Sequence, residues 1–136
     1  MTYRFVAHAA EGELDAEGDY IEAGVSEGAD GTGFVLLFMC GAAEPDGQDV
    51  AWGFDTHCVV TADQGTAYGC VREAVLEGKV LRVRLEPSVL DALGLGDAEI
   101  EAMLDAPVED TARFLDALRR VLAYGRPDAL PARVVL

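Results

Sequence analysis

The chain has 136 residues, 51% of them hydrophobic, and 25 acidic against 10 basic residues give it a formal net charge of −15. This length suits one domain with a substantial core, and the hydrophobic content excludes wholesale disorder, which needs low hydrophobicity together with high charge. No apolar run approaches the ~20 residues of a membrane span, and the start, MTYRFVAHAA, lacks the pattern of a signal peptide. We therefore expect a single α+β domain over residues 1–136, located in the cytoplasm.

The negative charge is concentrated in the first half of the chain. Residues 1–71 hold thirteen acidic residues and one basic residue, Arg4, whereas residues 72–136 hold twelve acidic and nine basic residues. An acidic surface repels phosphates, so we expect no binding to nucleic acid, and it attracts a basic protein. The alternative is that the charge only keeps the protein in solution or reflects a salt-rich cytoplasm.

Strand-like segments fill this first half. Residues 2–9 are aromatic and apolar enough for a first strand, residues 11–19 predict a charged, solvated connection, and Tyr20 begins a second short strand. The run FVLLFMC, residues 34–40, is continuously apolar, which is typical of a central strand covered on both faces. A turn follows around Pro45.

Residues 54–71 predict a β-hairpin, because FDTHCVVT and TAYGCV flank a short turn. Strand alternation places Asp55 and His57 on one face and Cys58 on the other. His57 and Cys58 therefore point apart, which argues against a catalytic pair made of these two residues. Cys58 and Cys70 face each other if the register pairs them directly, and a slip of one residue places them on opposite faces.

The next strand is predicted over residues 79–85, where apolar and basic residues alternate as expected for a sheet with one wet face. Together with the hairpin it would form a meander of three consecutive antiparallel strands. The last residues, ARVVL, are expected to form an edge strand.

Helices are predicted between these two strands. One begins at Pro87 and ends at Gly94, and a second short one begins at Asp97. The longest runs from about Glu109 to Tyr124, with an apolar face, acids at its start and arginines near its end. The predicted fold is therefore α+β: an antiparallel β-sheet of about five to seven strands with a long C-terminal helix and one or two short helices packed on it.

Sequence signals for catalysis are absent. The chain has no phosphate-binding glycine loop, no HExxH zinc helix and no GxSxG nucleophile elbow. Its three cysteines are an odd number without an export signal or a CxxC pair, so we expect reduced, structural thiols and predict no metal or cofactor. The remaining enzyme hypothesis uses Asp55 and His57 with Tyr68, and its alternative is a structural or surface contact of the same residues.

From Asp55 to about Leu122 the chain resembles the Immunity protein 10 family, whose members protect bacteria from polymorphic toxins. The resemblance lies in the DTHC tetrad from Asp55, in Tyr68, Gly69 and Val71, in the LxVxL strand from Leu81, in the helix PSVLDALGL and in the helix LDALRRVL. It implies an inhibitor that binds the active domain of a cognate toxin and blocks it. The alternatives are a small cytoplasmic enzyme using Asp55 and His57, and an interaction module unrelated to toxins.

The expected partner is a toxin domain that is basic, a nuclease being one candidate, with no membrane contact and with a homo-oligomer left open. Carboxylates of the acidic half would steer it electrostatically. Trp52 is an aromatic candidate for a hot spot, with core packing as the alternative. The expected partner-binding residues are Glu11, Glu13, Asp15, Glu17, Asp19, Asp46, Asp49, Trp52, Asp55 and His57.

Overall fold

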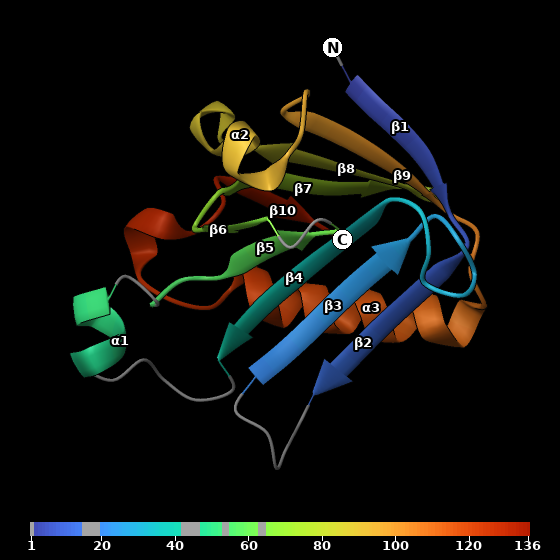
Figure 1. Ribbon diagram of the computed structural model, residues 1–136. Helices are drawn as coiled ribbons and strands as arrows, with labels where there is room; N and C mark the ends of the chain where they lie inside the picture. The colour runs from blue at the N-terminus through green and yellow to red at the C-terminus, as the bar shows by residue number, and fades with distance from the viewer. Residues whose placement is uncertain (1, 15–19, 42–46, 53–54, 63–64) are drawn as a thin grey trace.

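The computed structural model describes residues 2–14, 20–41, 47–52, 55–62 and 65–136, which form two five-stranded sheets (Figure 1). Sheet A has the order β1-β9-β8-β7-β10, with bounds Thr2–Ala7, Glu99–Leu104, Val80–Leu85, Val71–Glu77 and Arg133–Val135. Sheet B has the order β2-β3-β4-β5-β6, with bounds Ala9–Leu14, Tyr20–Ser26, Val35–Gly41, Cys58–Thr61 and Thr66–Tyr68. The α-helices of these residues are α1 (Gly47–Trp52), α2 (Leu90–Leu93) and α3 (Val108–Leu122), and 3-10 helices span Pro87–Val89 and Pro127–Ala129.

The two sheets differ in strand direction. Sheet B is antiparallel throughout. Sheet A is mixed, because β1 runs parallel to β9 and β10 runs parallel to β7. No helix in the described ranges is long and apolar enough to cross a membrane.

One hydrophobic core joins both sheets to α3, which lies behind β2, β3 and β4 in Figure 1. The helix buries Phe114, Leu118 and Val121. The inward side chains of the sheets include Leu81 and Val83 of sheet A and Ala23, Phe38 and Val59 of sheet B. Glu109 and Asp110 lie in the first turn of α3, and Arg119 and Arg120 lie in its last turn, which suits the helix dipole.

The α+β class is confirmed, but the single sheet that we expected is wrong. The predicted meander fails because β6 and β7 belong to different sheets. Between them, Gly69 has a φ of 61°, a conformation that favours glycine and turns the chain out of the strand. The 15-residue helix α3 is also not C-terminal, since a 3-10 helix and β10 follow it.

Two local predictions are also wrong. The segment from Asp97 forms strand β9 instead of a helix, because its buried Ile100, Ala102 and Leu104 alternate and it pairs on both sides, with β1 and β8. The charged segment from residue 11 is not a connection up to Leu14, because residues 9–14 form β2. By contrast, the strands at Tyr20, at residues 79–85 and at the C-terminal edge are confirmed.

Gly12 explains how a charged segment can be a strand of a packed sheet. A Cβ at this position would overlap the carbonyl group of Arg113, so the backbone of α3 lies directly against β2. Since side chains alternate along a strand, Gly12 faces the helix while Glu11 and Glu13 face the opposite way. The sequence Glu-Gly-Glu therefore suits an edge strand with one face against a helix.

Replacing Gly12 by alanine should destabilise the fold by about 1 to 3 kcal/mol, because the added methyl group must displace the helix backbone. Urea unfolding followed by circular dichroism measures this. The matched control is Gly96→Ala, since nothing lies within 4 Å of a Cβ at Gly96. Equal stabilities of the two variants would contradict the close contact between α3 and β2.

Candidate functional site

The face of sheet B that points away from α3 carries apolar side chains at its centre. Burial alternates along β4 and β5, with Leu36, Phe38 and Val59 pointing inward. The outward side chains at the centre are Leu37 and Met39 of β4 and Cys58 and Val60 of β5, all of which are partly exposed. In Figure 1 this face of β2, β3 and β4 is turned toward the viewer, and no described helix lies in front of it. The run FVLLFMC is thus a central strand, but α3 covers one of its faces only.

An acidic edge borders this apolar strip. Glu11 and Glu13 are exposed on β2, and Glu22 of β3 lies directly opposite Glu13. Burial raises the pKa of Glu22, and the nearby charges of Glu11 and Glu13 raise it further. None of the ion pairs among the described residues involves these three carboxylates. The chain has no lysine or arginine from residue 5 to residue 71, and in the part that the structure describes these like charges meet without an ion-pair partner.

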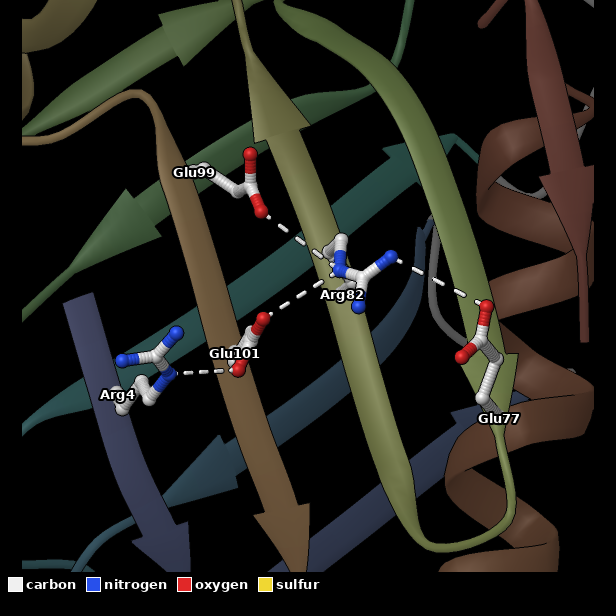
Figure 2. Close-up of polar contacts among 5 residues, drawn as sticks. All are labelled: Arg4, Glu77, Arg82, Glu99 and Glu101. Atoms are coloured by element: carbon white, nitrogen blue, oxygen red, sulfur yellow. Dashed lines mark hydrogen bonds and ion pairs between the residues drawn. The ribbon is translucent and has the colours of Figure 1, made fainter. Parts of the chain in front are cut away.

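The outer face of sheet A shows the opposite electrostatic arrangement (Figure 2). Arg82 lies at its centre, with Nε 3.4 Å from Glu101, Nε 3.6 Å from Glu99 and Nη1 4.0 Å from Glu77. Glu101 also accepts a hydrogen bond of 2.9 Å from Arg4 Nε, and this contact is the main cause of its lowered pKa. Sheet A therefore neutralises its charges internally, whereas the acidic edge of sheet B does not.

A hollow of about 390 Å³ lies on the outer face of sheet B beside the acidic edge. Gly24 lines it together with Glu11, Asp30 and Leu37. A Cβ at Gly24 would lie 2.9 Å from Leu37 Cδ1 and 3.5 Å from Glu11 Oε1, so the side chains of Leu37 and Glu11 lie directly over this glycine. Asp30 accepts hydrogen bonds from the hydroxyl and backbone N–H of Thr32, which lower its pKa. The hollow thus combines an apolar wall with two carboxylates.

Asp55, one of the expected partner-binding residues, is only 5% exposed. Its carboxylate accepts a hydrogen bond of 2.9 Å from Arg126 Nη1, and its backbone carbonyl accepts one of 3.0 Å from Arg126 N. The neighbouring Thr56 forms an isolated bridge with Gly125. These contacts attach the start of the hairpin to the segment that follows α3.

His57, also expected to contact a partner, is completely buried. Its Nε2 accepts a 3.1 Å hydrogen bond from the backbone N–H of Val71, so the proton of the neutral ring is on Nδ1, which has no hydrogen-bond partner among the described residues. Burial lowers the pKa of His57 to about 4, and the charge of Arg72 contributes to this shift. The structure does not join Asp55 and His57 as an acid–base pair, because each side chain has a different partner.

The register of the hairpin settles the question of the cysteines. Cys58 pairs with Tyr68, so it is not directly opposite Cys70. Alternating burial confirms that His57 and Cys58 point apart. All three cysteines are free, and burial raises the thiol pKa of Cys40 and Cys58 to about 11 and that of Cys70 to about 12. Such thiols are protonated at neutral pH, which suits structural cysteines.

The remaining expected site residues are only partly placed by the structure. Glu11 and Glu13 lie on the surface of β2, and Tyr68, from the enzyme hypothesis, is 46% exposed on β6. The positions Asp15, Glu17, Asp19 and Asp46 fall outside the described residues. Asp49 and Trp52 belong to α1, a helix that begins at Gly47, where the expected turn around Pro45 would still continue, and their side chains fall outside the described part. Pro45 itself also falls outside the described residues.

Sequence reasoning missed Glu22 and the apolar strip. Every residue of FVLLFMC is apolar, so the sequence shows no alternation that would indicate which side chains point outward. The alternation Tyr-Ile-Glu-Ala at the start of β3 is the signal that could have placed Glu22 on the face opposite Ile21 and Ala23. The sequence does not indicate the register between β2 and β3, which places Glu22 opposite Glu13.

The buried His57 makes stability depend on pH. Its folded-state pKa of about 4 lies below the ordinary value of 6.5, so the unfolded chain binds the proton first as the pH falls. The stabilisation is therefore complete above pH 6.5 and is lost as the pH falls toward 4, with a loss of about 2 kcal/mol between about pH 7 and pH 5.

Urea unfolding of the wild type and of His57→Gln at these two pH values isolates this contribution, because the carboxylates are common to both chains. Glutamine retains an acceptor for the N–H of Val71. We expect the wild type to lose about 2 kcal/mol more than the variant. Parallel pH profiles would show that His57 is not held neutral in the folded protein.

Comparison with known proteins indicates the family of this chain. Residues 6–112 match the family model described as Immunity protein 10. Neither a curated protein nor a solved structure matches the chain. The matched range covers all of sheet B and most of sheet A, including the strands that bear the acidic edge and the apolar strip. The match confirms the resemblance from Asp55 up to residue 112 and extends it toward the N-terminus, while the helix LDALRRVL lies beyond the matched range. The chain belongs to the Immunity protein 10 family, and its function is in immunity.

Proposed function

We propose that this immunity protein binds a cognate toxin domain of basic character and neutralises it by covering the toxin's active surface. The observation that carries the proposal is the uncompensated acidic edge made by Glu11, Glu13 and Glu22. Like charges directly opposite each other on a sheet reduce stability. A cationic partner would turn this unfavourable arrangement into a favourable contact.

A nuclease is the toxin class that fits this electrostatic pattern best. Proteins that act on nucleic acid bind phosphates through lysine and arginine side chains. A surface crowded with carboxylates presents the same sign of charge to those cations and can occupy the cleft in place of the substrate. Inhibition of this kind is stoichiometric and needs no catalytic group on the immunity protein.

The distribution of charge along the chain supports the same partner. All basic residues except Arg4 follow residue 71. Many of the described ones are engaged within the protein, as Arg82 is with three glutamates and Arg126 with Asp55 and Asp128. We propose that Glu11 and Glu13 steer the toxin, together with Asp15, Glu17, Asp19, Asp46 and Asp49 of the same acidic half, and that Trp52 lies near the contact.

The association rate of the chain with its cognate toxin domain should fall about tenfold or more as salt rises from low to physiological concentration, because salt screens the attraction. Stopped-flow fluorescence at several salt concentrations measures this rate, and the toxin's activity at increasing molar ratios measures neutralisation. A toxin that keeps its activity in an excess of the chain would contradict the proposed function.

The double variant Glu11→Gln/Glu13→Gln should show a shallower salt dependence than the wild type. The matched control is Asp91→Asn/Asp97→Asn, which removes the same charge from the region around α2. If both double variants change the salt dependence equally, net charge alone accounts for steering, and the acidic edge has no special role.

A further inference from the structure

We infer that the toxin docks on the outer face of sheet B, with the apolar strip of Leu37, Met39, Cys58 and Val60 at the centre of the interface. A lysine or arginine side chain of the toxin would occupy the hollow over Gly24. This inference rests on the proposed function and assigns it to one face of the fold.

The apolar strip is the first reason, and β8 provides the comparison within the same molecule. The outward positions Arg82 and Arg84 of β8 are charged, as expected for a strand with one wet face. The corresponding outward positions of β4 are Leu37 and Met39, although only the other face of this strand lies against α3. Apolar side chains at the centre of a surface with charges at its rim match the anatomy of a protein interface.

The acidic rim is the second reason, and it indicates the charge of the occupant. Glu13 and Glu22 face each other across β2 and β3, and Glu11 follows on the same face. No ion pair among the described residues reduces this repulsion. A partner with cations beside an apolar contact area is complementary to both parts of the face.

The hollow is the third reason, and it limits the shape of the contact. Its volume is about 390 Å³, and Glu11 and Asp30 provide carboxylates on its lining while Leu37 provides an apolar wall. A long aliphatic side chain with a cationic end suits such a lining, since its methylene groups can pack on the wall while its charge meets a carboxylate. Gly24 allows Leu37 and Glu11 to pack directly over the strand, because a Cβ there would be too close to Leu37 and would contact Glu11.

The outer face of sheet A fits a toxin less well. Its central charges already form ion pairs within the sheet, through Arg4, Arg82 and the glutamates around them (Figure 2). A cationic partner would have to break these contacts before it could form new ones. Sheet A therefore serves as the matched control face.

The first test is Glu22→Lys, with Asp97→Lys as a control that changes the net charge by the same amount. On sheet B the new lysine lies opposite Glu13, so the melting temperature should rise while the affinity for the toxin domain falls about tenfold or more. The control should bind within about threefold of the wild type, because only long-range attraction changes. Higher stability combined with weaker binding cannot arise from a folding defect.

The second test uses two neutral variants that do not alter charge. Leu37→Gln removes the centre of the apolar strip, and Gly24→Ala displaces the Leu37 and Glu11 side chains that line the hollow. Each should weaken binding about tenfold and leave the circular dichroism spectrum unchanged. The control for Leu37 is Met103→Gln, because Met103 is 47% exposed on the outer face of sheet A, and it should bind as the wild type does.

Isothermal titration calorimetry with the purified toxin domain separates the two proposals. If the wild type binds and neutralises the toxin while Glu22→Lys, Leu37→Gln and Gly24→Ala bind equally well, the docking face is overturned and the proposed function stands. If the wild type itself does not bind, the proposed function fails and this inference fails with it. Selective loss of binding in the sheet B variants supports both.

Discussion

The close approach of α3 to β2 is the constraint on which the surface of this protein depends. Gly12 has no side chain, so the helix backbone at Arg113 can lie against the strand. Once this face is against the helix, strand alternation decides the direction of every other side chain in sheet B. It sends Ala23, Phe38 and Val59 into the core, and it sends the carboxylates of β2 and β3 and the apolar strip outward. A shift of one residue would reverse this pattern and bury glutamates under the helix.

The two sheets share a core but present different outer faces. Sheet A alternates arginine and glutamate across neighbouring strands, so its charges stabilise one another. Sheet B places glutamate opposite glutamate and leaves apolar side chains partly exposed beside them. Both sheets belong to one chain and contribute to the stability of the same fold. Sheet B therefore carries a cost in stability that sheet A avoids, as expected if its outer face is the binding surface proposed above.

The stretch from Asp55 to Cys70 has the residue types of a catalytic site, and its described residues form a structural junction. Asp55 binds Arg126, Thr56 bridges to Gly125, and the carbonyl of His57 accepts a hydrogen bond from Gly69 N–H. His57 also accepts from Val71, the first residue of sheet A's strand β7. The hairpin thereby connects sheet B to sheet A and to the segment after α3. Polar side chains suit this position because the chain leaves one sheet and enters another, where backbone groups need partners.

The sequence by itself determined what depends on local pattern: the α+β class, the alternating strand β8, the hairpin, the amphipathic helix near residues 108–122, the asymmetry of charge and a likeness to immunity proteins. The tertiary structure alone decided the division into two sheets, the strand identity of residues 99–104 and the direction of each side chain in FVLLFMC. The physical reason is that these features depend on contacts between residues that are far apart in the sequence. Residues 99–104 form a strand because they pair with β1 at the start of the chain. Paired residues of the two strands, such as Arg4 and Glu101, are 97 positions apart in the sequence. The packing of α3 likewise decides which face of β4 points outward, and α3 is too far along the sequence for a local pattern to indicate this contact.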